Sequence, residues 1–319
     1  MLSIVFTGRN DNYGGNFQQR VFWHLGFNSK WLRYYGIEHE YIFVEWNPVE
    51  NKPFISESIK SNFPFVKCLV VDAEVNCYLS ENKNIQLHEF FAKNVGARRS
   101  NGEFVLFTNT DLLFGKKTLE FLASTKIGEL DVIRNHRMTI NNQPELVNHI
   151  VSSDDGLEIL ENPQVWKNFD HAGGPPHTAA SGDFTLCSRH LLDIVTGYDE
   201  KIKFASTHLD SRFLHRIYQI TKRFHVIDKG YHVDHNRSYF DRPPIEWKKY
   251  DIERCINWNF TANLDNYNNG SNWGYVDILD EISRENDLTI LKLKSEYKKT
   301  TRNIANREPV IPPAFRLYG

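Results

Sequence analysis

An acidic residue at the end of an apolar run is the feature of this sequence with the clearest chemical meaning. The apolar run Phe104–Thr108 is followed directly by Asn109, Thr110 and Asp111. Open α/β folds bind their ligands at the carboxyl ends of the strands, which is where Asp111 is expected to lie. Oxygen ligands of this type bind hard divalent cations, and Mg²⁺ usually shares them with substrate phosphates. The stretch therefore predicts a metal-assisted phosphate site in which Asp111 supplies the carboxylate.

Alternating strand-like and helix-like segments precede Asp111, and these elements must position it. Apolar residues recur at helical spacing from Phe17 to Tyr35 and again from Leu87 to Val95. Short β-rich runs separate the helical patterns, and this alternation predicts a mostly parallel sheet covered by helices. The runs are Leu2–Thr7, Tyr41–Glu45, Val66–Val71 and Phe104–Thr108.

The alternation is less regular after Asp111. A long polar stretch up to about Gly182 is expected to be a loop excursion that shapes an acceptor pocket. Ser188 is placed to cap a short helix that Gly197 ends, and another helix begins near Thr207. Beyond Arg242 the chain is Asn-rich with a helical pattern, which predicts a C-terminal helical extension. Further strands are expected at Asp131–Arg134, Phe184–Cys187 and Phe224–Asp228.

Bulk composition is that of an ordinary globular protein. With 319 residues, 40% of them hydrophobic, the chain can form one large or two modest domains with a real core. The net charge of −2 gives no support for nucleic-acid binding, and four scattered cysteines make a zinc ribbon or disulfide framework unexpected. Because no apolar run approaches the roughly 18 residues that span a membrane, and Leu2–Thr7 is too short for a signal sequence, a soluble cytoplasmic protein is expected.

The order of several motifs resembles the pattern of GT-A glycosyltransferases, in particular those of family 2. The resemblance covers roughly residues 3–240, and Asn109 replaces the first Asp of the DxD motif found in that family. The matching stretches are Thr7–Asp11, Val44–Pro48, Asn94–Asp111 and Ser181–Phe184, the last continuing to Arg212.

This resemblance implies a fold and a division into domains. The expected fold is α/β, a Rossmann-like GT-A domain with a mostly parallel central sheet flanked by helices. The catalytic domain is expected over 1–240, with its nucleotide-binding half over about 1–115 and its acceptor half over about 116–240. The helical extension then occupies 241–319.

The resemblance also implies which residues bind the donor. In the family, the loop after the first strand lies against the nucleotide, and an acidic residue ends the second strand near the base or ribose. Basic residues before the metal-binding strand would meet the pyrophosphate. From the residues alone, a polar turn, a solvated strand end and a cation-favouring helix C-terminus remain open alternatives. The implied nucleotide-sugar residues are Thr7, Gly8, Arg9, Asn10, Glu45, Arg98, Arg99, Asn109 and Asp111.

A late histidine often completes the metal site of GT-A enzymes, and two histidines follow the last predicted strand of this chain. His232 and His235 lie three residues apart, so in an extended segment only one of them faces the metal. The resemblance implies Asp111 and His235 as ligands of Mn²⁺ or Mg²⁺, with His232 as the further candidate. A structural role for either histidine stays open.

The segment from Thr207 to Arg212 resembles the part of inverting enzymes in which an acidic residue opens a helix. By this match Asp210 is the general base that takes the acceptor proton, and Asp183 binds an acceptor hydroxyl. Thr207 and Asp210 also have the spacing of a capping box, which would make Asp210 a structural residue. The paired Glu-Asp of many relatives is missing, because Leu209 precedes Asp210.

The predicted activity is metal-dependent transfer of a hexosyl group, with inversion. The donor is UDP- or GDP-linked, and the acceptor is a hydroxyl of a glycan or glycoconjugate. A sugar nucleotidyltransferase is the first alternative, although Thr7–Gly15 only loosely approximates the Gly-rich phosphate loop that it needs. A non-catalytic carbohydrate-binding protein is the second, because aromatic residues make up 13% of the chain.

Overall fold

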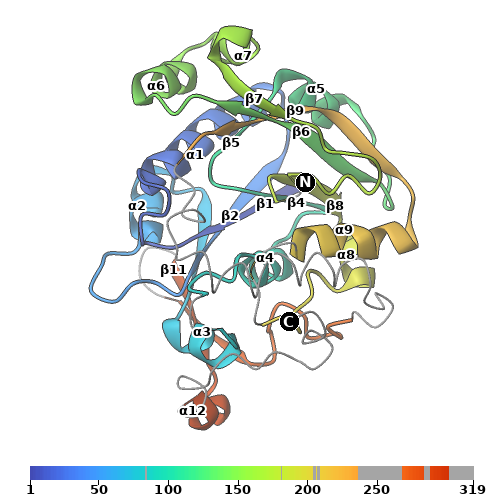
Figure 1. Ribbon diagram of the computed structural model, residues 1–319. Helices are drawn as coiled ribbons and strands as arrows, with labels where there is room; N and C mark the ends of the chain where they lie inside the picture. The colour runs from blue at the N-terminus through green and yellow to red at the C-terminus, as the bar shows by residue number, and fades with distance from the viewer. Residues whose placement is uncertain are drawn as a thin grey trace, which may run out of the picture.

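A single mixed sheet forms the centre of the protein (Figure 1). The structure is a computed structural model, and it describes residues 1–82, 85–180, 182–203, 206, 209–235, 268–283 and 288–301. Within those residues the strand order is β10-β11-β3-β2-β1-β4-β8-β6-β9-β5, with β7 paired to β6. The predicted sheet flanked by helices is confirmed, and its parallel part carries the carboxyl edge at which the site lies.

The parallel part contains β1 (Leu2–Gly8), β2 (His39–Trp46), β3 (Val66–Val71) and β4 (Phe104–Thr108). These strands pair in parallel, β3 with β2, β2 with β1 and β1 with β4. All seven residues of β1 are buried, as expected for a strand covered on both faces. The four β-rich runs of the sequence are therefore strands at the expected places.

Helices cover both faces of this parallel part (Figure 1). Ile4 and Phe6 of β1 belong to the core beneath α1 (Phe17–Tyr34) and α2 (Ile55–Asn62). Val5, between them, belongs to the opposite core beneath α4 (Glu89–Arg98). The alternation of side chains along the strand thus divides the interior into two cores. The short helix α3 (Ala73–Leu79) adds to the second core.

Gly96 lets α4 pack directly on the sheet, and this gives a stability prediction. A Cβ atom at Gly96 would lie 2.6 Å from Cγ1 of Val5 and 2.9 Å from Cγ2 of Val44. We expect Gly96→Ala to lower the free energy of unfolding by about 1–3 kcal/mol, because overpacking a core costs that much. Urea denaturation measures the change. Gly174→Ala, with no atom within 4 Å of the added Cβ, is the control; equal stability of both variants would contradict the close packing.

The second part of the sheet is mixed. Strand β8 (Phe184–Ser188) runs antiparallel to β4, while β6 (Val132–Ile140) and β9 (Phe224–Val233) pair in parallel. The three predicted strands in this region are present, and β6 and β9 continue beyond their predicted ends. Strand β5 (Leu112–Phe114) pairs antiparallel with β9, and α5 (Lys116–Ser124) follows it.

The polar stretch before Gly182 is not the uninterrupted loop that the sequence predicts. Its buried residues Val147, Ile150, Leu157 and Leu160 face the core from two helices, because apolar positions at helical spacing are enough to anchor short helices. The elements in this stretch are α6 (Pro144–Ser152), α7 (Gly156–Leu160), η1 (Pro163–Val165) and β7 (Trp166–Asp170).

Two helices follow β8 on the α4 side of the sheet. Ser188 caps α8 (Arg189–Val195) by accepting a hydrogen bond from the backbone N–H of Leu191, as predicted. The helix ends at Thr196 and Gly197, which both have positive φ. The next helix, α9 (Leu209–Ile220), buries Leu209, Phe213, Leu214 and Ile217.

The described part of the predicted helical extension contains strands as well as a helix. Strands β10 (Leu279–Ser283) and β11 (Leu288–Leu293) pair antiparallel, and β11 pairs in parallel with β3. Helix α12 (Ser295–Thr301) follows. Leu288, Ile290, Leu291 and Leu293 are buried, so this apolar run extends the sheet beyond β3, with β10 outside it. The residues 236–267 and 302–319, on which the rest of the extension was predicted, lie outside the described residues.

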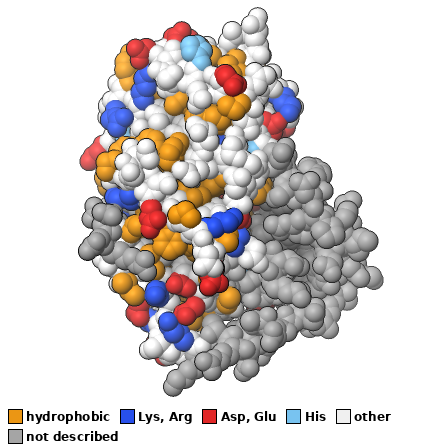
Figure 2. Space-filling view, turned by 90° about the vertical axis from the view of Figure 1, so that its left-hand side faces the viewer, with side chains coloured by type: hydrophobic (Ala, Val, Ile, Leu, Met, Phe, Trp, Pro, Cys, Tyr) orange, Lys and Arg blue, Asp and Glu red, His pale blue; other side chains and the backbone are white. Residues whose placement is uncertain are grey.

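No helix within the described ranges is long and apolar enough to cross a membrane. On the face shown in Figure 2, acidic and basic side chains are interspersed with small hydrophobic patches. The described residues on that face (Figure 2) therefore present no extended basic surface of the kind that binds nucleic acid.

Candidate active site

Asp111 and two histidines converge at the carboxyl edge of the parallel strands. Nε2 of His235 lies 3.1 Å from Oδ2 of Asp111, and Nε2 of His232 lies 3.6 Å from Oδ1. One possible ligand atom from each of the three residues lies within 4.8 Å of the others. The structure thus brings together all three residues that the sequence analysis named as metal ligands.

Strand pairing explains why the histidines reach Asp111. His232 stands opposite Leu112 in the antiparallel β5–β9 pair, and the backbone N–H of Val233 donates to the carbonyl of Asp111 (2.9 Å). Strand β9 ends at Val233, so the strict alternation of faces does not extend to His235. The expectation that only one histidine faces the metal is therefore wrong, and both approach the same carboxylate.

The electrostatics of Asp111 favour an ionised ligand. Burial alone raises the pKa of this carboxyl, but His232, His235 and Arg20 outweigh burial and hold the pKa well below its usual range. Oδ1 of Asp111 and Nδ1 of His232 are buried and have no hydrogen-bond partner among the described residues. A cluster of unpaired oxygen and nitrogen atoms of this kind is what a divalent cation would satisfy.

Arg20 is a site residue that the sequence analysis missed. Its side chain is fully buried on α1, where Nη1 donates to Oδ2 of Asp111 at 3.0 Å and Nη2 donates to the carbonyl of Tyr13. His24 and Asn28 follow at four-residue spacing, and both contact the carbonyl of Leu112. Polar residues at four-residue spacing among the apolar positions of this amphipathic helix were the available signal, because polar groups on a buried helix face need polar partners.

A second group of polar side chains lies beside the first. Nδ2 of Asn109 donates to Oδ1 of Asp183 at 2.8 Å, and Oδ1 of Asn109 accepts from Nζ of Lys93 at 2.9 Å. Nε of Arg137 lies 3.4 Å from Oδ2 of Asp183. Thr139, two residues beyond Arg137 on β6, stands opposite His232 on β9. Asn109 and Asp183 therefore adjoin the metal-binding candidates across the β6–β9 pair.

Asp210 belongs to the same region. A methyl group placed on Gly182 would lie 3.5 Å from Oδ2 of Asp210, 3.6 Å from Nδ2 of Asn109 and 3.8 Å from Oε1 of Glu89. Asp210 lies in the first turn of α9, and its Oδ1 accepts from the backbone N–H of Ser211 (2.8 Å). Thr207, the partner in the predicted capping box, lies outside the described residues.

Arg134 is a buried cation behind these carboxylates, and the sequence analysis did not identify it. Burial lowers its pKa to about 10, while the charges of Asp210 and Asp183 oppose that shift. Its guanidinium donates to the carbonyls of Ala179 (3.0 Å) and His177 (3.2 Å). Arg134 therefore holds in place the loop that leads to Asp183.

The predicted nucleotide residues of β1 and β2 have structural partners. Both carboxylate oxygens of Glu45 accept from the first backbone N–H groups of α2, and Glu45 is fully buried, so it caps that helix. Oγ1 of Thr7 donates to the carbonyl of Val44 (2.7 Å). Gly8 packs against the ring of Phe17 so closely that a Cβ would be only 2.2 Å from it.

The loop after β1 stays at the carboxyl edge. Nε of Arg9 donates to the carbonyl of Asn47 (2.6 Å), and its Nη1 pairs with Asp11 (3.0 Å). Asn10 is buried and bridges to the backbone of Val49 and Pro53. These contacts hold the loop at the carboxyl edge of the sheet.

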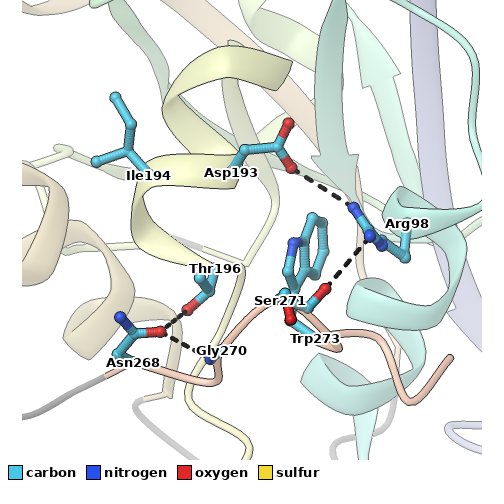
Figure 3. Close-up of a pocket in the computed structure, with 8 residues that line it drawn as sticks. All are labelled: Arg98, Asp193, Ile194, Thr196, Asn268, Gly270, Ser271 and Trp273. Atoms are coloured by element: carbon cyan, nitrogen blue, oxygen red, sulfur yellow. Dashed lines mark hydrogen bonds and ion pairs between the residues drawn. The ribbon is translucent and has the colours of Figure 1, made fainter. Parts of the chain in front are cut away.

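Arg98 and Arg99 lie at the far end of α4 from Asn109. Arg98 pairs with Asp193 (3.8 Å) and donates to the carbonyl of Ser271, and it lines a pocket together with Trp273 (Figure 3). Arg99 pairs with Glu281 (2.6 Å). The structure therefore does not bring these two arginines to the site, whereas Lys93 of the same helix does reach it.

Glu200 joins the loop before α9 to α4, and its ionisation gives a prediction for the effect of pH. Its Oε1 accepts from Nδ2 of Asn94 (2.8 Å) and from the backbone N–H of Gly274 (2.7 Å). Burial raises its pKa to about 7, so the folded state binds this proton more tightly than the unfolded state does. The stabilisation is present below the unfolded pKa of about 4.3 and is lost as the pH rises through 7.

We therefore expect Glu200→Gln to remove a fall in melting temperature between about pH 4.5 and pH 7. Melting curves of the wild type and the variant across this range measure the difference. Glu50→Gln, at an exposed position, is the control. Parallel pH profiles for the wild type and Glu200→Gln would contradict the assignment.

Comparison with known proteins gives structural likeness only. No family model matches the sequence, and no curated protein matches it. A mannosyltransferase from Pyrobaculum calidifontis, solved with GDP-Man and Mn²⁺, is similar to 73% of this chain at 13% identity and a TM-score of 0.44. The matched part is 56% of that enzyme's length.

Two further solved structures are similar to this chain. The catalytic domain of Drosophila β1,4-galactosyltransferase 7, in complex with xylobiose, matches 94% of this chain and 96% of its own length, at 12% identity and a TM-score of 0.41. The inositol-1-phosphate CTP transferase from T. maritima matches 74% of this chain and 89% of its own length, at 11% identity and a TM-score of 0.37. Because the identities to these structures are at most 13% and the TM-scores at most 0.44, the activity is inferred from the residues of the site.

Proposed function

We propose that this protein is a metal-dependent glycosyltransferase that moves a sugar from a nucleoside diphosphate sugar to a hydroxyl group. The observation that carries the proposal is the convergence of Asp111, His232 and His235 at the carboxyl edge of the parallel strands, beside Asp183 and Asp210. A metal-binding cluster next to separate carboxylates supplies the two functions that sugar transfer needs, leaving-group stabilisation and proton removal.

Asp111, His232 and His235 are the residues that would hold the cation. Two imidazole nitrogens in the ligand set favour Mn²⁺ over Mg²⁺, which prefers oxygen ligands. A bound cation of this type neutralises charge that builds on a departing diphosphate. Arg20 keeps Asp111 oriented, and the loop from Arg9 to Tyr13 lies where a UDP- or GDP-linked donor would meet the edge of the sheet.

Asp210 is proposed as the base for the acceptor hydroxyl and Asp183 as a residue that binds the acceptor. Asp210 lies beside Gly182, and Arg212, two residues further on, is fixed by a buried ion pair with Asp199 (2.6 Å). The first turn of α9 is therefore held firmly. Direct attack by a hydroxyl deprotonated at Asp210 would invert the anomeric configuration, since the sugar passes through an oxocarbenium-like state with one displacement.

A panel of nucleoside diphosphates and nucleotide sugars, each with and without Mn²⁺, tests the proposal by thermal stability. A ligand that binds only the folded state stabilises it by about 2.7 kcal/mol at a hundredfold excess over its Kd. We expect a Mn²⁺-dependent rise in melting temperature with one nucleotide, and slow release of the nucleoside diphosphate from its sugar conjugate. Release of pyrophosphate from a nucleoside triphosphate would instead indicate a nucleotidyltransferase. If no nucleotide changes the melting temperature, both the glycosyltransferase and the nucleotidyltransferase assignments are wrong.

A further inference from the structure

Asn109 lies in the middle of a chain of partly buried polar contacts. Nζ of Lys93 donates to Oδ1 of Asn109, and Nδ2 of Asn109 donates to Oδ1 of Asp183. The Lys93 side chain is fully buried and also contacts Oε1 of Glu89 (2.6 Å) and the carbonyl of Gly182 (3.1 Å). Each polar atom of the Asn109 amide therefore already has a protein partner.

The two partners fix the orientation of the Asn109 amide. The Lys93 ammonium can only donate, and an ionised Asp183 carboxylate can only accept. The amide satisfies both, because it presents an acceptor to Lys93 and a donor to Asp183. An Asp at position 109 would instead set one carboxylate oxygen against another across the 2.8 Å contact. The neutral amide is thus the residue type that this arrangement requires.

One carboxylate oxygen of Asp183 is bound by Asn109, and the other accepts no hydrogen bond from the described residues. Oδ1 accepts from Asn109, whereas Oδ2 is buried without a hydrogen-bond partner among the described residues and faces Nε of Arg137 at 3.4 Å. The charge of Arg137 compensates that of Asp183, but within the described part of the chain this buried oxygen still accepts no hydrogen bond, which a ligand hydroxyl could donate. The Asn109 bond leaves that oxygen available to a hydroxyl.

We propose that Asn109 is a positioning residue that orients Asp183 toward the acceptor and takes no part in holding the metal. This rests on the proposed function, which assigns the acceptor to Asp183 and the metal to Asp111, His232 and His235. Asn109 then is not a weakened version of an acidic metal ligand. Its side chain serves the acceptor side of the site, and Asp111 serves the metal side.

Asn109→Asp is the decisive variant, because a carboxylate at position 109 would tighten Mn²⁺ binding if residue 109 held the metal, whereas it breaks the bond to Asp183 in either case. Binding of Mn²⁺ alone is followed by electron paramagnetic resonance, and the KM of the nucleotide sugar selected by the thermal panel is measured by its hydrolysis. We expect both constants to stay within twofold of the wild type. With methyl glycosides as acceptors, the acceptor KM should rise at least fivefold. Tenfold tighter Mn²⁺ binding by Asn109→Asp would overturn the proposal.

The double variant Asn109→Asp with Asp183→Asn provides the rescue, since the hydrogen bond can form with donor and acceptor exchanged. We expect Asn109→Asp to melt several degrees below the wild type and the double variant to regain most of that loss. If the double variant melts no higher than Asn109→Asp, the hydrogen bond between residues 109 and 183 does not stabilise the protein and the proposal is wrong. Asn109→Ala, which removes both bonds without adding charge, keeps the test valid if Asn109→Asp does not fold; its Mn²⁺ affinity should be unchanged.

The same measurements separate this inference from the proposed function. If the wild type shows no Mn²⁺-dependent nucleotide binding, the glycosyltransferase proposal fails, and the acceptor role of Asp183 fails with it. If the wild type binds Mn²⁺ and donor but Asn109→Ala loses Mn²⁺ affinity tenfold, the proposed function stands and the positioning role is wrong.

Discussion

Replacing Asp111 with asparagine should abolish Mn²⁺-dependent nucleotide binding while leaving the fold intact. The amide keeps an oxygen that can accept from Nη1 of Arg20, but it loses the charge that two histidines and Arg20 surround. We expect at least a 100-fold loss of Mn²⁺ affinity, about 2.7 kcal/mol. Titration with Mn²⁺ by electron paramagnetic resonance and the thermal panel with nucleotide both measure it.

Asparagine is preferred to alanine at this position because of Arg20. The Arg20 side chain is fully buried. Asparagine removes its counter-charge but still accepts from Nη1, whereas alanine leaves this guanidinium group without either, at a cost of about 3–5 kcal/mol. Asp111→Ala is therefore expected to destabilise the protein as well as the site, and the two effects would be confused. Unchanged metal-dependent binding by a folded Asp111→Asn variant would remove Asp111 from the metal site.

Replacing Asp210 with asparagine should greatly slow sugar transfer without weakening the binding of the donor. A positioned base contributes about 10²–10⁴-fold to the rate of such reactions, and an amide cannot take the proton. The asparagine oxygen can still accept from the backbone N–H of Ser211, so the first turn of α9 should persist. We expect the rate of sugar transfer to fall by that factor, while the nucleotide-induced shift in melting temperature stays the same.

Asp193→Asn is the matched control for Asp210→Asn. Asp193 is a half-exposed carboxylate on α8 that pairs with Arg98 at the other end of α4. Its replacement removes the same charge far from Gly182 and should leave turnover within about twofold. Normal turnover in Asp210→Asn would show that another group takes the acceptor proton, and Glu89 beside Gly182 would be the next to test.

The parallel strands could be predicted because burial on both faces leaves a clear pattern. Val66–Val71 and Phe104–Thr108 are continuous β-rich runs, and the structure places β3 and β4 at those residues. The position of Asp111 could be predicted from β4, since a carboxylate after a buried parallel strand lies at the carboxyl edge of the sheet. The helices α6 and α7 were missed because they are only nine and five residues long, too short for their apolar residues to show a clear helical period.

Arg98 and Arg99 were misplaced for a topological reason. A helix that leads into a parallel strand ends near the amino end of that strand, so residues just before β4 lie at the opposite edge from Asp111. Lys93, about one and a half turns earlier on α4, lies closer to the carboxyl edge and reaches Asn109. The edge of the sheet at which a residue of α4 lies is set by the direction of the helix and not by the distance of that residue from β4 in the sequence.

Other site residues depended on pairings between distant segments. The approach of His232 to Asp111 follows from the pairing of β5 with β9, and no local pattern contains that register. The ion pair between Arg137 and Asp183 likewise requires β6 and the end of the loop before β8 to meet. Glu45 was predicted to bind the nucleotide because it ends a strand. In the structure, both of its carboxylate oxygens accept hydrogen bonds from the start of the next helix.

The pairing of β11 with β3 affects the order in which the protein can complete its fold during synthesis. Leu291 pairs with Val71, which lies 220 positions earlier in the chain. At a translation rate of about 5–20 residues per second, β3 waits roughly 10–40 s on the ribosome for its outer neighbour. Throughout that time an apolar parallel strand is an open edge that other chains can pair with. The nascent protein is therefore most exposed to misassembly before β11 is made, and protection by a chaperone would matter most in that interval.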